Sequence, residues 1–273
     1  MYEDFFGMAR TPFLNSMPES ALYLSNEHRE LLGRLQYAAE KRMFAVVSAD
    51  VGCGKSTMIR KFRATIDHDR FMVLYLADSM LTPRWFYKGL LEQLGIEAKF
   101  YRGDAKRQLH RQLALIRETH RKDVVTVVDE AHLLDRETFE EIRFLLNCDM
   151  DSCNPMALFL CGQGEIWDKL KLQQYAAIRQ RIDIKCFLPA FDRSQTGEYI
   201  RAHLNHAGVE AELFTDAAKD EVYKYSAGAA RAINKACTHA LMSAAQTNKK
   251  LIDDAIVKNV VEREMADGPR ARR

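Results

Sequence analysis

The sequence predicts a three-layer α/β domain built on a five-stranded parallel sheet, followed by a small all-α domain. The apolar runs at 43–49, 71–77, 124–129, 156–161 and 184–188 are nearly continuous in hydrophobicity. Such runs are typical of parallel strands that are covered on both faces. Segments with helical periodicity separate the runs, and this alternation predicts a doubly wound sheet. Pro189 ends the alternation, and only helical segments follow it.

Helices are expected on both sides of Pro189. In the α/β part they cover 26–41, 55–67, 83–94, 104–121, 135–147 and 165–181, and beyond it they cover 192–207, 214–225, 229–246 and 250–264. An i, i+3, i+4 stripe predicts the buried face of the third late helix; it consists of Ile233, Ala236, Cys237, Ala240, Leu241 and Ala244. We therefore expect an α/β domain over 1–190, with 1–41 as its lead-in and first helix, a helical domain over 191–265 and a flexible basic tail over 266–273.

The composition is that of a soluble globular protein, with 47% hydrophobic and 29% charged residues in a chain of 273. A net charge of +2 does not by itself indicate a nucleic-acid partner. The chain has no apolar run of about 18 residues and no basic start before an apolar run, so neither a membrane span nor a signal peptide is expected. The six cysteines, at 53, 148, 153, 161, 186 and 237, lack disulfide-framework or zinc spacing and predict free thiols in a reducing cytoplasm.

The segment SADVGCGKST (48–57) runs from the first expected strand into a helix, the setting in which G-x-x-x-x-G-K-[ST] binds phosphate. Glycines 52 and 54 allow backbone N–H groups to turn toward an anion. Lys55 would reach the β- and γ-phosphates of ATP, and the Ser56 hydroxyl would bind Mg²⁺. Ala49 replaces the first glycine, but this position ends the strand and need not touch phosphate. The expected nucleotide-binding residues are Asp50, Val51, Gly52, Cys53, Gly54, Lys55, Ser56 and Thr57; a glycine-rich turn without a ligand is the alternative.

The apolar strand at 124–129 ends in two carboxylates, Asp129 and Glu130. Asp129 is placed to hold Mg²⁺ together with Ser56, and Glu130 to polarise the water that attacks the γ-phosphate. Two carboxylates after a strand could instead cap the next helix. Their place after a phosphate loop favours the metal-and-base interpretation.

In this order, the motifs resemble those of the AAA+ ATPases. They are more closely similar to the ExeA-like group, which includes secretion ATPases and the TniB- and TnsC-type ATPases of transposons. The resembling blocks are MYEDFFGM…PF (1–13), LYLSNEH (22–28), DEAH (129–132), EEIRFLLN (140–147), LFLCGQGEI (158–166), IRQRI (178–182) and SAGAARAIN (226–234). The resemblance implies an AAA+ core with a helical lid, Mg²⁺-dependent ATP hydrolysis, and assembly into a ring or helical filament.

The resemblance also implies roles for single residues. Gln163 matches a polar sensor beside the attacking water, with a plain loop residue as the alternative. Arg231 matches a second sensor that reaches the γ-phosphate from the lid, with a helix-surface salt bridge as the alternative. Either Arg179 or Arg181 would enter the neighbouring subunit's site as a finger.

Residues 22–28 are expected to line the adenine pocket, although Tyr23 and Leu24 could equally be core. The sequence departs from the group in the lid, where Ala229-Ala230-Arg231 replaces the more usual Ile-Pro-Arg. This departure puts the lid geometry in doubt.

The transposon relatives imply a function for the whole chain. They imply an ATP-dependent DNA-binding regulator that oligomerises on target DNA and recruits or activates a transposase, with or without a targeting protein. The chain shows neither the membrane span nor the cell-wall-binding region expected of a secretion ATPase, so we expect a cytoplasmic protein without a membrane partner. A secretion or cell-envelope ATPase, and a nucleotide-switched adaptor with little turnover, are the alternatives.

A basic segment at 99–122 is the expected contact to double-stranded DNA. Lys106, Arg107, His110 and Arg111 have the spacing of a single helical face, which would grip phosphates without reading bases. A solvated basic helix is the alternative. The basic tail, with Arg270, Arg272 and Arg273, would be disordered or would tether a partner. The expected DNA contacts are Lys99, Arg102, Lys106, Arg107 and Arg111.

Overall fold

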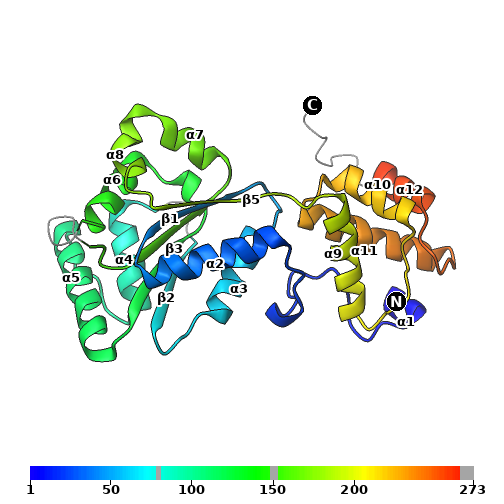
Figure 1. Cartoon of the computed structure of the whole chain (residues 1–273), viewed down its shortest axis with the longest axis horizontal. Helices are drawn as coiled ribbons and strands as arrows, with labels where there is room; N and C mark the ends of the chain where they lie inside the picture. Colours follow the sequence, from blue (N-terminus) through cyan, green and yellow to red (C-terminus); the bar gives the residue numbers. More distant parts are fainter. Residues whose placement is uncertain (78–80, 148–152, 265–273) are drawn as a thin grey trace. The chain divides into compact units, whose positions relative to one another are not determined.

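The computed structural model describes residues 1–77, 81–147 and 153–264 (Figure 1). The chain forms two compact units. The sheet unit comprises 28–49 and 55–188, and the helical unit comprises 1–27, 50–54 and the chain from Pro189 onward. This division differs from the expected one, because 1–27 and the loop 50–54 group with the late helices. The expected tail at 266–273 and Cys148 lie outside the described residues.

The sheet unit contains five parallel strands in the order β2-β3-β4-β1-β5. β1 lies between β4 and β5, so that Val47 pairs with Cys161 on one side and Cys186 on the other. All five expected strands are confirmed, each within one or two residues of its predicted ends. They are β1 (Phe44–Ala49), β2 (Phe71–Leu76), β3 (Asp123–Val128), β4 (Ala157–Gly162) and β5 (Ile184–Leu188).

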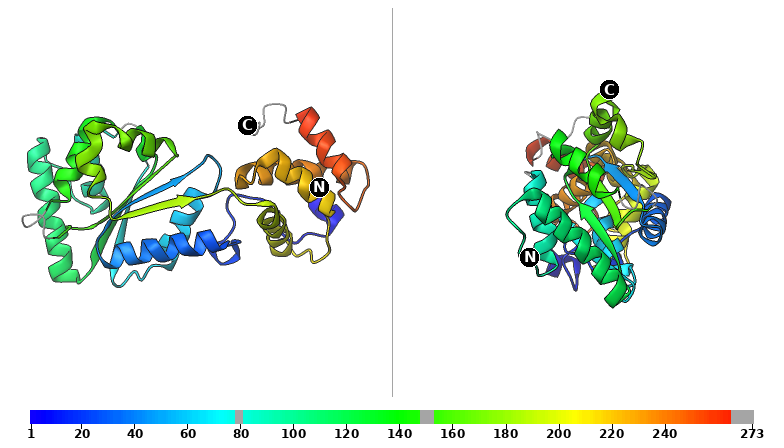
Figure 2. Two further views of the ribbon diagram at one scale, coloured as in Figure 1. Left: turned by 45° about the horizontal axis from the view of Figure 1, so that its top comes forward. Right: turned by 90° about the vertical axis from the view of Figure 1, so that its left-hand side faces the viewer.

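Helices cover both faces of this sheet (Figure 2). On one face, α3 packs through Phe62, whose ring meets Phe159 of β4 edge-on at 5.5 Å. The other face carries a continuous core shared by the strands and the helices that follow β2, β3 and β4. The helices are α2 (Asn26–Glu40), α3 (Lys55–Thr65), α4 (Pro83–Gln93), α5 (Arg102–Leu115), α6 (Arg136–Leu145), α7 (Glu165–Lys171) and α8 (Ala176–Arg179). Burial of both faces explains why the strands show no alternation in hydrophobicity.

Two expected helices of the sheet unit are interrupted. The segment 165–181 breaks at Leu172, whose backbone is extended, into α7, a 3-10 turn and α8. The break lets Tyr175 and Ile178 reach the core. The segment 104–121 forms α5 and then a π-helical turn at Ile116–His120, which ends at Arg121 in the left-handed conformation.

The helical unit is organised around α11, as the apolar stripe predicted. All six stripe residues are fully buried and share one core with α1, α9, α10 and α12. The isolated pairing of Phe214 with Ile252 ties the start of α10 to the segment before α12. The helices are α1 (Tyr2–Phe6), α9 (Arg193–His206), α10 (Asp216–Ser226), α11 (Ala230–Gln246) and α12 (Asp254–Glu264), with short 3-10 turns at Glu19–Ala21 and, in the sheet unit, Ala131–Leu133.

A tight turn between α10 and α11 depends on Gly228. Its φ is +79°, and a Cβ atom here would lie 1.8 Å from the Phe191 carbonyl oxygen. The Phe191 N–H in turn donates to the Gly228 carbonyl at 3.0 Å. Only glycine allows this approach, and the turn sets where α11 begins.

None of the helices in the described ranges is long and apolar enough to cross a lipid bilayer.

The helical unit should lose stability in mild acid because of His203. This buried side chain stacks on Phe13, and its Nδ1 accepts a hydrogen bond from the Phe13 N–H at 3.1 Å. Burial, together with nearby His206, lowers the pKa of His203 to about 4. The unfolded chain, with a pKa near 6.5, therefore binds the proton more readily. The stabilising contribution is complete above about pH 6.5 and is lost as the pH falls toward 4.

We expect His203 alone to remove about 2 kcal/mol of unfolding free energy between pH 7 and pH 5. Urea unfolding at the two pH values measures the total change. The His203→Asn variant retains an acceptor but does not titrate, so its pH dependence should be smaller than that of the parent by this amount. An equal pH dependence in the two proteins would show that His203 is not the sensitive group.

Candidate functional site

The phosphate loop joins β1 to α3. Ala49 is buried as the last residue of β1, so its methyl group occupies the strand end as expected. Gly52 and Gly54 have φ of +82° and +91°, the left-handed backbone that turns successive N–H groups to one side. The Cys53 N–H donates to the Asp50 carbonyl at 3.3 Å. The loop thus has the backbone form that the sequence required.

Lys55 begins α3 and lies against the two carboxylates that follow β3. Its ammonium donates to Asp129 Oδ1 and lies 3.3 Å from Glu130 Oε1. Ser56 Oγ donates to Asp129 Oδ2 at 3.2 Å. The side chains of Lys55 and Asp129 are only 10% and 5% exposed, whereas that of Glu130 is 38% exposed. The structure therefore brings the predicted lysine, serine and carboxylates together and leaves Glu130 accessible to a substrate.

The charges in this cluster stabilise each other. Burial disfavours the charged form of Lys55, but the hydrogen bond and negative charge of Asp129 outweigh it and raise the lysine pKa. Burial likewise disfavours charged Asp129, but Lys55 and the Tyr75 hydroxyl outweigh it and lower the aspartate pKa. Both groups are therefore charged at neutral pH, as phosphate and metal binding require.

Tyr75 is a site residue that the sequence did not reveal. Its hydroxyl, on β2, donates to Asp129 Oδ2 at 2.8 Å. Burial and this hydrogen bond raise the pKa of Tyr75 above its usual range, so it remains a donor. A tyrosine near the end of an apolar strand was a visible signal, but the sequence could not show that β2 lies beside β3.

Glu130 adopts a strained backbone conformation, with φ of +52° and ψ of +31°. Left-handed conformations are uncommon for glutamate and cluster at functional sites. His132 follows it, and its Nδ1 lies 3.6 Å from Glu130 Oε2 and accepts a 3.5 Å bond from the Gln163 N–H. Lys169 fixes the same turn by donating to the His132 and Leu134 carbonyls at 2.6 and 2.8 Å. Gln163, the expected sensor, is thus joined through its backbone to the carboxylate turn.

The two finger candidates differ in their surroundings. The Arg179 guanidinium donates to the carbonyls of Leu170 and Lys171, at 2.9 and 2.8 Å, and so caps the end of α7. Arg181 follows α8 and is partly exposed. These two bonds give Arg179 a structural role at the end of α7.

The remaining expected nucleotide residues belong to the helical unit. Tyr23 lies edge-on to Phe191 at 5.6 Å, and its hydroxyl donates to Glu198 at 2.6 Å. Leu24 next to it is partly buried. Arg231 lies exposed in the first turn of α11, and its N–H donates to the Gly52 carbonyl at 3.1 Å. This bond links the lid arginine's backbone to the phosphate loop despite the Ala-Ala departure.

The phosphate loop contains a thiol, Cys53. Burial and the charge of Asp50 raise the pKa of Cys53 to about 11, so its thiol stays protonated and unreactive at neutral pH. The described cysteines, at 53, 153, 161, 186 and 237, are all free thiols, as expected.

Two of the expected DNA contacts form ion pairs within the protein. Arg102 and Lys106 approach the buried carboxylate of Glu141 at 3.6 and 3.4 Å, and the Tyr87 hydroxyl donates to it at 2.8 Å. Because a buried carboxylate requires a partner, Lys106 contributes to the stability of the sheet unit through this contact. Arg102 remains mostly exposed.

The other expected DNA contacts face solvent. Within the helical spacing of α5, Lys106 and His110 are partly buried, whereas Arg107 and Arg111 are exposed. The spacing argument ignored the burial of the first pair against neighbouring elements. Lys99 is also exposed, and Arg107 pairs with Asp104 at 2.6 Å.

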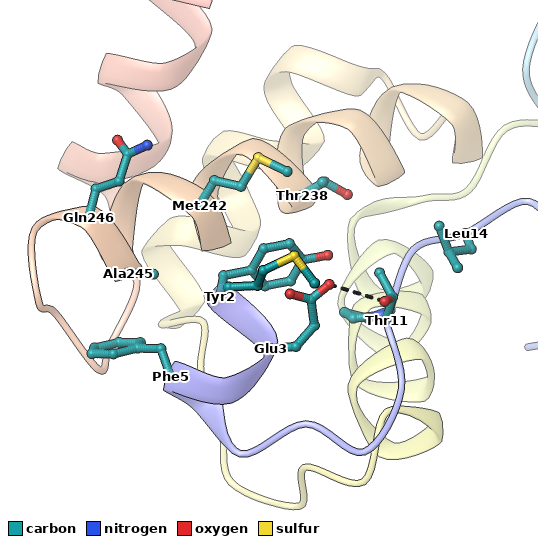
Figure 3. A pocket seen from close by; sticks show the side chains of 11 residues that line it. Tyr2, Glu3, Phe5, Thr11, Leu14, Thr238, Met242, Ala245 and Gln246 are labelled. Carbon is teal, nitrogen blue, oxygen red and sulfur yellow. Dashed lines mark hydrogen bonds between the residues drawn. The ribbon is translucent and has the colours of Figure 1, made fainter.

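A separate hollow of about 650 Å³ lies in the helical unit between α1 and α11 (Figure 3). Its wall is mainly apolar, and the Thr11 hydroxyl donates to Glu3 at its edge, at 3.1 Å. None of the expected nucleotide or DNA contacts lines it, so it is not part of the candidate site.

The oxygen ligands present fit a magnesium ion. Ser56 Oγ and Asp129 Oδ2 lie within hydrogen-bond distance of each other, and Mg²⁺ prefers such oxygens. No cluster of three or more His, Cys, Asp or Glu suited to a metal occurs among the described residues. A metal here would therefore complete its shell with water and phosphate oxygens, which is the usual habit of Mg²⁺.

Comparison with known proteins agrees with this geometry. Residues 38–170 match the family model described as an AAA domain, and such a match indicates a nucleotide-binding ATPase domain. The chain is also 28% identical over 249 residues to general secretion pathway protein A of Aeromonas hydrophila. The alignment covers 89% of this chain but 45% of that protein, so the chain spans less than half the length of this relative.

Solved structures show the same fold at low sequence identity. The Drosophila ORC bound to DNA gives a TM-score of 0.69 at 18% identity, covering 95% of this chain and 64% of that one. Cdc6p from Pyrobaculum aerophilum gives 0.67 at 14% identity, covering 88% and 67%. The RuvB Holliday junction branch migration motor of Thermotoga maritima gives 0.59 at 16% identity, covering 88% and 69%. The predicted AAA+ P-loop fold is confirmed.

Removing the Tyr75 hydroxyl should weaken the hold on Asp129. In Tyr75→Phe the carboxylate loses one of its donors, a charge-assisted bond whose loss typically costs about 1.5–3 kcal/mol. We expect ATP hydrolysis to need several-fold more Mg²⁺ for half-maximal rate, as measured by steady-state turnover across Mg²⁺ concentrations. Tyr37→Phe, on exposed α2 surface, is the matched control. Identical Mg²⁺ dependence in both variants would show that the Tyr75 hydroxyl does not contribute to Mg²⁺ binding.

Proposed function

We propose that this protein is an ATP-hydrolysing, DNA-binding regulator of DNA transposition. The observation that carries the ATPase part is the cluster in which Lys55 and Ser56 meet Asp129, with the more exposed Glu130 beside them. Lys55 and the loop N–H groups bind the phosphates, Ser56 and Asp129 hold Mg²⁺, and Glu130 accepts the proton of the attacking water. The magnesium ion supplies positive charge at the phosphates when bound.

Further residues complete the proposed site. Gln163 acts as the polar sensor beside the attacking water, and the hydrogen bond from its N–H to His132 holds it in place. Arg231 contacts the nucleotide from the lid, and Tyr23 and Leu24 lie along the adenine. One of Arg179 and Arg181 of a neighbouring copy acts as the finger, and we take Arg181, which follows α8 and is partly exposed. The proposed active form is therefore a homo-oligomer, either a ring or a helical filament.

DNA is the proposed partner because exposed cations gather on one part of the sheet unit. Lys99, Arg107 and Arg111 are exposed, and Arg102 is mostly so, which suits sequence-tolerant contact with phosphates. Structural likeness to an ORC bound to DNA and to a Holliday junction motor supports the same partner. In the transposition proposal, the ATP-bound oligomer on DNA recruits a transposase.

Retention of a fluorescent duplex at low salt tests the DNA part. The protein is compared with a slowly hydrolysed ATP analogue, with ADP and without nucleotide, and retention should require the ATP analogue. Arg107→Ala with Arg111→Ala should weaken it about tenfold and reduce the salt slope by about two. Lys171→Ala, an exposed lysine on α7, should change neither. Equal absence of retention in all three nucleotide states would disprove DNA binding.

The transposition part has its own test. A transposase encoded next to this gene should be captured by the protein–DNA complex with the ATP analogue, and deletion of this gene should reduce insertion. Insertion that is unchanged by the deletion would limit the proposal to DNA binding.

A second candidate is an ATPase of a secretion or cell-envelope system. It is favoured by the 28% identity to general secretion pathway protein A. Cell fractionation and crosslinking separate the two: stable recovery with envelope proteins, together with a secretion defect on deletion, would favour this candidate over the transposition proposal.

A further inference from the structure

Three exposed aromatic side chains lie in the stretch of chain that connects β2 to β3, outside the nucleotide site. Trp85 of α4 is 52% exposed, and Phe100 and Tyr101, in the segment leading into α5, are 69% and 71% exposed. Large aromatic side chains are normally buried. Their shared exposure indicates a surface that meets a ligand or partner.

Cations lie against these rings. Arg84 Cζ is 4.4 Å from the centroid of Phe100, and Lys88 Nζ is 4.3 Å from the centroid of Trp85. Arg84 and Lys88 also line a hollow of about 690 Å³, together with Glu92, Glu97, Ala98, Lys99, Phe100 and Gln108. We call Arg84, Trp85, Lys88, Lys99, Phe100 and Tyr101 the aromatic–cationic surface.

The segment that carries this surface is held in place. Gln108 of α5 accepts from the Lys99 N–H at 3.1 Å and donates to the Glu97 carbonyl at 3.0 Å. Phe100 and Tyr101 meet edge to face, with centroids 5.3 Å apart. A preformed surface loses less entropy when it binds than a mobile one does.

We propose that the aromatic–cationic surface binds unpaired bases of a DNA strand. Stacking on aromatic and guanidinium planes, with lysines along the phosphates, is how proteins hold single strands without reading sequence. Intact duplex keeps its bases stacked inside, so it cannot use the rings in this way. The proposal therefore rests on the proposed DNA-binding function and adds to it a contact for single-stranded or locally opened DNA.

Charge favours a nucleic-acid partner over a protein partner. The surface carries three cations, and exposed Arg102, Arg107 and Arg111 continue from it along α5. Two carboxylates lie at the hollow, Glu97 and Glu92, and Glu92 pairs with Lys88 at 3.4 Å. The three cations of the surface and the arginines of α5 outnumber them. The net positive charge is complementary to phosphate.

Trp85 offers a direct measurement. The chain has two tryptophans, and the other, Trp167, is partly buried and donates to Ser48 Oγ at 2.8 Å. In a Trp167→Phe background, titration with an oligo-dT strand should quench Trp85 emission in a saturable way. An abasic strand of equal length keeps the phosphates but has no bases, and should bind about tenfold more weakly.

Substitutions assign the effect to the surface. Phe100→Leu and, separately, Arg84→Ala should each weaken oligo-dT binding about fivefold to tenfold, with less effect on duplex. Phe187→Leu is the matched control, since Phe187 is 61% exposed on β5, at the opposite edge of the sheet from β2. Circular dichroism of each variant checks that the fold is retained.

The outcomes separate this inference from the proposed function. Duplex retention without Trp85 quenching by oligo-dT, or equal binding of abasic and normal strands, overturns the inference alone. Quenching by oligo-dT without duplex retention supports the inference and overturns the duplex contact. Emission that changes with protein concentration alone, without DNA, marks a contact between copies and overturns the inference.

Discussion

Replacing Glu130 with glutamine should slow ATP hydrolysis by about 100-fold or more, because positioned general bases typically contribute 10²–10⁴-fold. ATP affinity should stay within about twofold, because Lys55 and the loop N–H groups, not Glu130, bind the phosphates. Glutamine keeps the size of the side chain and loses only the charge that draws the proton from water. The expected protein therefore binds ATP and does not turn it over.

Single-turnover hydrolysis and a fluorescent-nucleotide titration measure the two effects separately. Glu137→Gln, an exposed carboxylate in the first turn of α6, is the matched control and should leave both unchanged. The comparison also tests the switch alternative. An unaltered, very low rate in Glu130→Gln would mean that the parent protein acts as a nucleotide-switched adaptor without catalytic turnover.

The nucleotide motifs could be predicted because each is local. Lys55 and Ser56 begin the helix that follows β1, and Asp129 and Glu130 directly follow β3. In a parallel sheet the carboxyl ends of the strands share one edge. The strands themselves were visible from continuous hydrophobicity. The sequence therefore predicted both the fold and the residues that meet in the sheet unit.

The contacts that the sequence did not predict depend on the order of the strands in the sheet and on long-range packing. Tyr75 reaches Asp129 because β2 pairs with β3, which no periodicity reveals. From its sequence position, Glu141 looks like a surface residue of an amphipathic helix. In the structure it is buried and forms an ion pair with Lys106 of α5. The helical spacing of the basic segment was correct, but the burial of Lys106 was not visible.

The N-terminal segment illustrates the same limit. Its aromatic residues at Tyr2, Phe6 and Phe13 join the core of the helical unit, although sequence order placed them with the α/β part. Phe13 contacts His203, which lies more than 180 positions further along the chain. A local sequence pattern cannot predict such a distant partner.

Removing Arg181 should nearly abolish hydrolysis while ATP binding persists, if this arginine completes the site of a neighbouring copy. Arginine fingers are worth about 10³–10⁵ in turnover, so Arg181→Ala should reduce the rate by about 1,000-fold. Arg179→Ala is the informative counterpart. It removes two hydrogen bonds at the end of α7 and should cost about 1–2 kcal/mol of stability with a much smaller effect on turnover.

Mixing two inactive proteins distinguishes a finger supplied by a neighbour from one acting within its own chain. An Arg181→Ala subunit retains Glu130, and a Glu130→Gln neighbour can supply the missing arginine. At equal amounts, random assembly makes about a quarter of the sites complete, so about a quarter of the parent rate should return. No recovery in mixtures that do assemble would show that Arg181 acts within its own subunit. The opposite result is also informative. If Arg179→Ala abolishes hydrolysis while Arg181→Ala does not, and mixing Arg179→Ala with Glu130→Gln restores hydrolysis, then Arg179 is the finger.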